Sequence, residues 1–104
     1  MITDKQAEDY LHKLVDTDEE AAELKVDVER QSYALKRVEA ALYKTADRNI
    51  EERKAKAKTS EEYRAQEKIY FDAYLASEKM NNQRKSWVLI LDVYRTQCAN
   101  RRQG

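Results

Sequence analysis

The chain has 104 residues, the size of one ordinary domain with a modest interior. Charged residues make up 38% of it and hydrophobic residues 41%, and the 20 acids balance the 20 lysines and arginines. There is no proline and one glycine, so the composition excludes a fold rich in strands and tight turns and favours long α-helices. Disorder, the other outcome expected of so polar a chain, is disfavoured because the apolar residues are regularly spaced.

A first helix is predicted at residues 4–15. Thr3 and Gln6 have the spacing of a capping box, in which each side chain hydrogen-bonds to the other residue's backbone. The apolar residues that follow lie on one helical face: Ala7, Tyr10, Leu11, Leu14 and Val15. A second capping box begins at Thr17, and acidic residues after it suit the start of a new helix, so we expect the first helix to end near Asp16.

The second predicted helix spans residues 18–57. Its core positions alternate in steps of three and four, which is the a/d heptad pattern of a coiled coil, and Gln31 is the polar member. The apolar members are Ala21, Leu24, Val28, Leu35, Val38 and Leu42. Beyond them the pattern shifts register to Ala46 and Ile50. A helix of roughly forty residues, about 60 Å long, needs a partner along its length.

Thr59 and Glu62 form a third capping box, so the chain is expected to turn there and to enter a third helix at residues 60–102. This helix has a heptad pattern interrupted by Gln66 and Arg84. Its other members are Tyr63, Tyr70, Ala73, Ser77, Met80, Trp87, Leu91, Tyr94 and Cys98.

Two heptad helices joined by a short connection should lie antiparallel. The predicted fold is therefore all-α and forms a single domain over residues 1–104. It is a long, coiled-coil-like antiparallel helical hairpin with the short N-terminal helix packed at its open end. We expect the start of the second helix to lie opposite the end of the third.

The segment 86–94 is apolar almost all the way round the helix, so one partner helix cannot cover it. We expect the first helix to cover one side, making a three-helix bundle there, and another subunit to cover a further side. Leaving such side chains in water forfeits roughly 1.5–3 kcal/mol each, which favours a homo-oligomer. The predicted oligomer or partner interface consists of Trp87, Val88, Leu89, Ile90, Leu91, Val93 and Tyr94.

Charge is distributed unevenly although it sums to zero. Residues 1–29 hold ten acids and three bases, whereas residues 30–58 hold nine bases and four acids. Basic side chains near the predicted turn could neutralise the phosphates of a nucleic-acid backbone without reading its bases. Alternatively, they are solvated and complement a helix dipole. The predicted DNA-binding residues are Arg48, Arg53, Lys54, Lys56, Lys58, Arg64 and Lys68.

The residue types that catalysis needs are scarce, with one histidine, one cysteine and no glycine-rich phosphate loop. His12 shares a helical face with Asp9 and Asp16, but this pattern occurs once, whereas di-iron bundles duplicate it, so a surface histidine is favoured over a metal ligand. We therefore expect a protein that is not an enzyme and holds no metal or cofactor. A lone cysteine, a start unlike a signal peptide and no long apolar run predict a soluble, cytoplasmic protein.

The C-terminal helix carries a family resemblance. Its segment Ser86-Trp87-Val88-Leu89-Ile90-Leu91-Asp92-Val93-Tyr94, preceded by Arg84-Lys85 and followed by Ala99-Asn100-Arg101-Arg102, resembles small phage-encoded helical proteins of the UvsY recombination-mediator family. The resemblance spans roughly residues 25–102. The basic stretch at 53–58 would take the place of the mediator's basic stretch.

What this resemblance implies is a non-catalytic homo-oligomer of the bacteriophage host's cytoplasm that acts in DNA recombination. Such a protein binds single-stranded DNA, helps to load a recombinase and assists displacement of a single-strand-binding protein. The alternative that the residues leave open is a coiled-coil structural or adaptor protein that binds another protein, either through residues 87–93 or through its acidic N-terminal part.

Overall fold

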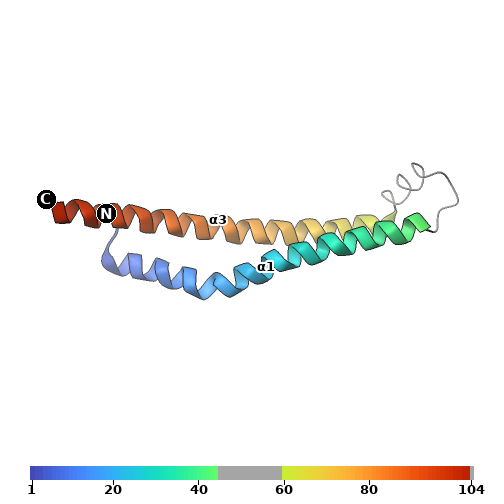
Figure 1. Ribbon diagram of the computed structural model, residues 1–104, viewed down its shortest axis with the longest axis horizontal. Helices are drawn as coiled ribbons and strands as arrows, with labels where there is room; N and C mark the ends of the chain where they lie inside the picture. The colour runs from blue at the N-terminus through green and yellow to red at the C-terminus, as the bar shows by residue number, and fades with distance from the viewer. Residues whose placement is uncertain (45–59, 104) are drawn as a thin grey trace. The chain divides into compact units, whose positions relative to one another are not determined.

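The computed structural model describes residues 1–44 and 60–103, and these form two long helices (Figure 1). Helix α1 spans Asp4–Lys44 and helix α3 spans Glu61–Gln103. The prediction of an all-α helical hairpin is confirmed. Within these residues neither helix is long and apolar enough to cross a membrane.

The chain falls into two compact units, each built from a segment of α1 and a segment of α3. Unit 1 comprises Met1–Ala22 and Glu78–Gly104, and unit 2 comprises Glu23–Ser77. In unit 2 the described residues are 23–44 and 60–77.

The two helix segments of unit 1 run antiparallel. The backbone N–H of Ile2 donates to the Gln97 side chain at 3.2 Å, and the Tyr94 hydroxyl donates to Asp4 at 2.5 Å. Farther along, Arg84 donates to the Leu14 carbonyl at 2.8 Å. The start of α1 therefore lies beside the end of α3.

Unit 2 has the same antiparallel pairing, and a polar layer crosses it. The Gln66 side chain donates to the side chain of Gln31 at 2.8 Å, and Gln31 in turn donates to Asp27 at 3.3 Å. The two glutamines are the polar members of the predicted heptad patterns, and the structure places them opposite each other. A polar pair at core positions specifies register at some cost in stability.

Both helices begin with side-chain caps. At α1, Thr3 and Gln6 make the reciprocal hydrogen bonds of the predicted capping box, at 3.0 and 3.1 Å. At α3, the Tyr63 backbone N–H donates to the Ser60 hydroxyl at 3.2 Å, so Ser60 acts as the cap. Thr59, for which the cap was predicted, lies outside the described residues.

The predicted helix boundary near Asp16 is wrong, because α1 continues through it. The Thr17 hydroxyl donates to the Lys13 carbonyl at 2.7 Å, within the helix, instead of capping a new one. Thr17 also continues the heptad spacing between the two stretches that were assigned to separate helices. The core positions then run as one series: Ala7, Tyr10, Leu14, Thr17, Ala21.

One continuous helix changes what lies at the end of α3. No separate N-terminal helix, and hence no third helix for a bundle, is present among residues 1–22 and 78–103. The start of a second helix was predicted to lie opposite the end of α3. Residues 2–7 lie there instead. The predicted end of the second helix at residue 57 and the predicted turn at Thr59 lie outside the described residues. The third predicted helix, at residues 60–102, corresponds to α3, which spans residues 61–103.

Each unit buries few hydrophobic side chains among its described residues. Among the described residues the buried hydrophobic side chains are Ala7 and Ala73, and no large side chain is fully buried. Heptad residues such as Tyr70, Trp87 and Leu91 are half-buried. Two paired helices cover one stripe of each other and leave the flanks of that stripe open to solvent.

Candidate interaction surfaces

The structure divides the predicted interface residues into two groups. Val88, Leu89 and Val93 are 45%, 64% and 50% exposed. The others are half-buried and lie on or beside the seam of paired heptad positions: Trp87, Ile90, Leu91 and Tyr94. The first group is therefore free to contact another chain, whereas most of the second contributes to the pairing of α1 with α3.

Trp87 packs in the seam of unit 1. The Lys13 ammonium lies 5.9 Å from the Trp87 ring centroid and 5.1 Å from that of Tyr10. This is a cation–π arrangement that draws a residue of α1 onto an aromatic residue of α3. The position agrees with a packing role for the tryptophan.

Tyr94 fastens the start of α1 to α3. Its hydroxyl donates to the Asp4 carboxylate, and this hydrogen bond raises the pKa of Tyr94 above its ordinary value, with Cys98 a second cause. The neutral phenol is the form that can donate to a carboxylate, so the fold favours it.

Arg84 connects α3 to α1 in the middle of unit 1, a structural role that the heptad pattern did not predict. Its guanidinium donates to the Leu14 carbonyl at 2.8 Å, to the Thr17 hydroxyl at 2.7 Å and to Asp18 at 3.1 Å. The side chain is 20% exposed. The signal in the sequence was Thr17, a polar residue at a heptad position, which can accept a hydrogen bond from a cation opposite.

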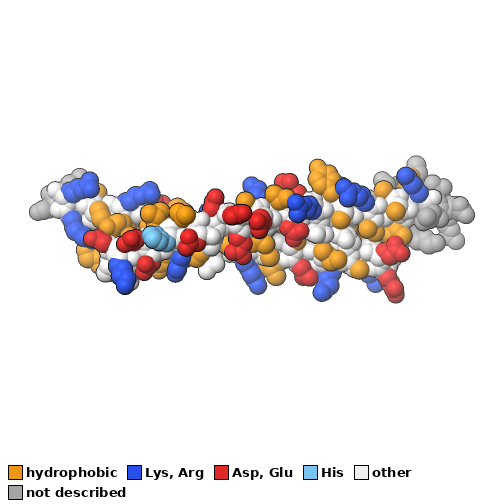
Figure 2. All heavy atoms as spheres, turned by 90° about the horizontal axis from the view of Figure 1, so that it is seen from below, with side chains coloured by type: hydrophobic (Ala, Val, Ile, Leu, Met, Phe, Trp, Pro, Cys, Tyr) orange, Lys and Arg blue, Asp and Glu red, His pale blue; other side chains and the backbone are white. Residues whose placement is uncertain are grey.

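Leu11 and Val15 are exposed apolar residues on α1 that the sequence had placed on the packed face. They are 53% and 69% exposed. Leu11 lines a hollow of about 300 Å³ between the two helices, together with Ala7, Leu91, Tyr94 and the charged Asp4, Glu8 and Arg95. Hydrophobic side chains are visible at the surface among the charged ones (Figure 2).

Three of these exposed residues lie on one flank of unit 1, and we call them the apolar patch: Leu11, Val15 and Val88. Leu11 and Val88 occupy equivalent positions, each next to the heptad seam on the same side. They also lie at the same level, because Lys13 and Trp87 meet beside them. Charge surrounds this patch with opposite signs on the two helices.

The charge of unit 1 is separated by helix. Residues 1–22 contain seven acids and two bases, a net charge of −5. Residues 78–104 contain six bases and two acids, a net charge of +4. The unit therefore presents an acidic helix beside a basic one.

The predicted DNA-binding residues are brought together only in part. Arg64 and Lys68 are exposed on α3 in unit 2, and Lys68 lies 3.7 Å from Asp72. An exposed pair of this kind contributes little to stability and leaves the ammonium available. The remaining five lie outside the described residues: Arg48, Arg53, Lys54, Lys56 and Lys58.

Exposed aromatic side chains follow Arg64 and Lys68 along α3. The Tyr70 ring centroid lies 5.3 Å from that of Phe71 and 6.3 Å from that of Tyr74. Phe71 is 57% exposed, and its spacing from Arg64 and Lys68 places all three on one stripe of the helix. A stripe of cations and exposed rings can contact phosphates and stack on bases.

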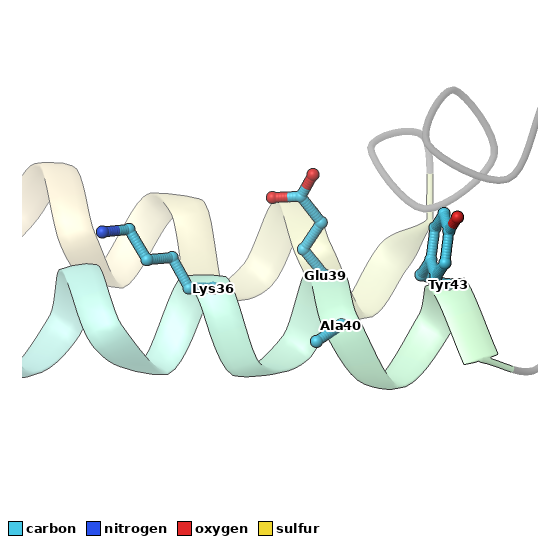
Figure 3. Close-up of a pocket in the computed structure, with 4 residues that line it drawn as sticks. All are labelled: Lys36, Glu39, Ala40 and Tyr43. Carbon is cyan, nitrogen blue, oxygen red and sulfur yellow. The ribbon is translucent and has the colours of Figure 1, made fainter. Parts of the chain in front are cut away.

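A second hollow lies beside the last turns of α1. Among the described residues it is lined by Lys36, Glu39, Ala40 and Tyr43, all from α1 (Figure 3). One cation, one carboxylate and one phenol on successive turns of one helix do not make a nucleophile–base pair.

His12 is a surface residue. Its Nε2 lies 3.7 Å from a Glu8 oxygen, and both side chains are more than two-thirds exposed. Within the described part of the chain, no three histidine, cysteine or acidic side chains are grouped so that they could hold a metal ion.

Comparison of the chain with protein-family models, curated proteins and solved structures finds no match. The resemblance to recombination mediators of the UvsY type therefore stays a prediction, and function has to be inferred from the surfaces described above.

Proposed function

We propose that the protein is a non-catalytic helical scaffold that binds the helices of another polypeptide chain through the apolar patch of unit 1. The observation that supports this proposal is the exposure of Leu11, Val15 and Val88, at 45–69%, in a unit where Ala7 is the buried hydrophobic residue among those described. Among the described residues of this unit, exposed large hydrophobic side chains outnumber fully buried ones.

The energetic argument favours a partner. Covering a large aliphatic side chain contributes roughly 1.5–3 kcal/mol, and side chains of this patch are only half-covered by the pairing of α1 with α3. A further amphipathic helix laid along the flank would cover Leu11 and Val88 together. The charged rim at Glu8 and Arg95 would set its orientation.

Site-specific photo-crosslinking tests this function. A photoreactive phenylalanine analogue at Val88 should yield a protein adduct, after nuclease treatment, in the cells that naturally express the chain. The same analogue at Arg30, an exposed position of unit 2, serves as the matched control. Absence of any protein adduct from position 88 would contradict the proposal.

The second candidate is a recombination accessory protein that binds single-stranded DNA. It is supported by the stripe of Arg64, Lys68 and Phe71 on α3. Oligonucleotide anisotropy at about 50 and 200 mM salt tests it, because phosphate contacts make affinity fall steeply with salt. Equal, weak binding of single strands and duplexes at both salt concentrations would remove this candidate.

A further inference from the structure

The flank of unit 1 that carries the apolar patch is charged at one end. On α1, Asp4 and Glu8 precede Leu11 along this flank. On α3, Val88 is followed by Arg95, which lies 3.3 Å from Asp92 and is 77% exposed. The flank therefore has an apolar part and, at one end, an acidic edge on α1 beside a basic edge on α3.

A twofold axis can bring two such flanks face to face in two ways. One way lays α1 on α1 and α3 on α3, which places a charge of −5 on −5 and of +4 on +4. The other lays α1 of each copy on α3 of the other, which places −5 on +4 twice. Because like charges facing each other cost several kcal/mol, the second arrangement is strongly favoured.

In that arrangement the levels of the two copies coincide. The hydrogen bond between Asp4 and Tyr94 shows that the start of α1 and the Arg95 turn of α3 lie at one level within a copy. A twofold axis parallel to the helices preserves levels. The acidic edge at Asp4 and Glu8 then faces Arg95 of the second copy, and Leu11 faces its Val88.

We propose that the partner of the apolar patch is unit 1 of a second copy, with α1 of each copy lying on α3 of the other in an antiparallel four-helix bundle. This inference rests on the proposed function and names its partner. The interface is isologous, so each contact occurs twice. It covers the central apolar residues and pairs the acidic helix with the basic one.

Sedimentation equilibrium tests the stoichiometry. The wild-type chain of 12.3 kDa should sediment with twice its mass at about 10–100 µM. A monomer throughout this range overturns the inference. A monomer that still gives an adduct with a different protein from position 88 overturns self-pairing alone, whereas absence of any adduct overturns the proposed function.

Charge reversal tests the arrangement. Glu8→Lys and Arg95→Glu should each weaken dimerisation at least about 10-fold, and either an equal mixture of the two variants or both changes in one chain should restore it. The ion pairs that Glu8 and Arg95 make with His12 and Asp92 are exposed, so the helices should remain folded by circular dichroism.

Glu29→Lys, an exposed charge reversal in unit 2, should leave dimerisation unchanged and serves as the control. Dimerisation that is unaffected by the single reversals, or that fails to recover in the doubly reversed chain, overturns the arrangement of α1 on α3. If one of the two single variants folds poorly, the doubly reversed chain still tests the arrangement of α1 on α3.

Discussion

Single polar side chains carry much of the specificity in unit 1. Arg84 meets three acceptors on α1 while 20% exposed, and Tyr94 binds Asp4 near the N-terminus. Because buried hydrophobic residues are few, these hydrogen bonds determine which turns of α1 and α3 face each other. Removing either set of hydrogen bonds should therefore measurably lower the free energy of unfolding.

Arg84→Ala should lower the free energy of unfolding by about 1–3 kcal/mol, because Thr17 and the Leu14 carbonyl lose a partly buried charged donor. Urea unfolding followed by circular dichroism measures this loss. Lys85→Ala, the exposed neighbouring cation, is the control and should change stability by less than about 0.5 kcal/mol. Equal effects of the two substitutions would contradict the structural role of Arg84.

Tyr94→Phe should change how stability depends on pH. The folded chain holds the pKa of Tyr94 above its ordinary value of 10.0, so the neutral phenol binds its proton more tightly in the folded state. The resulting stabilisation is present below pH 10.0 and is lost as pH rises through the folded pKa. Wild-type stability should then fall more steeply above pH 10.0 than that of Tyr94→Phe.

Unfolding curves recorded at successive alkaline pH values check this prediction for Tyr94. Tyr33→Phe, at a tyrosine that is 61% exposed, is the matched control and should follow the wild-type profile. Parallel pH profiles for the wild type and Tyr94→Phe would show that the hydrogen bond to Asp4 does not contribute.

At the scale of the elements, the main finding is that α1 is one helix. The capping signature at Thr17 was a valid local signal, but the hydroxyl donates to the Lys13 carbonyl and accepts from Arg84 instead. Local capping patterns compete with the heptad repeat, and here the repeat prevails because it brings successive turns of α1 onto α3.

Hydrogen exchange should confirm the continuity of α1. Amide protons of the first four residues of a helix have no intrahelical acceptor and exchange quickly. In a continuous helix the amides of residues 18–20 instead donate within α1, so they should be protected as well as those of residues 10–12. Rapid exchange confined to 18–20 would indicate that a helix boundary exists there.

The Gln31–Gln66 layer of unit 2 should specify register at the expense of stability. Replacing both glutamines by leucine should raise the free energy of unfolding by roughly 1–2 kcal/mol, because apolar core positions replace a half-buried polar pair. The same variant should populate additional oligomers, which sedimentation velocity would detect. A less stable variant that forms one species would refute this prediction.

At the scale of the whole molecule, folding and association should be coupled. Few hydrophobic residues are buried in the part of the chain that the structure describes, so the protein should gain stability when a second copy covers its apolar patch. The melting temperature of the wild-type protein should therefore rise with protein concentration. Leu11→Ser combined with Val88→Ser should remove this dependence, whereas Lys79→Ala should preserve it.

Scanning calorimetry at protein concentrations spanning about a hundredfold range measures this dependence. A wild-type melting temperature that is independent of concentration would show that the patch is not covered by another copy. That result would also count against the homo-oligomer expected from the apolar segment 86–94.

Much of the fold was predictable from spacing alone. The heptad steps predicted two long paired helices with Gln31 and Gln66 as polar core members, and the structure brings these two side chains together. The apolar segment at 86–94 likewise predicted that side chains such as Leu89 would remain uncovered. Of the predicted DNA-binding residues, the sequence placed Arg64 and Lys68 on an exposed helix, and their role stays a prediction.

The sequence by itself therefore determined that this protein is a pair of heptad helices, because periodicity is a property of one chain read along its length. Only the tertiary structure decided that Thr17 lies within α1, that Arg84 binds across to it and that Leu11 and Val88 share a flank. These facts depend on the register between two segments far apart in the chain. That register is set by which side chains meet across the seam, and spacing within each helix does not specify it.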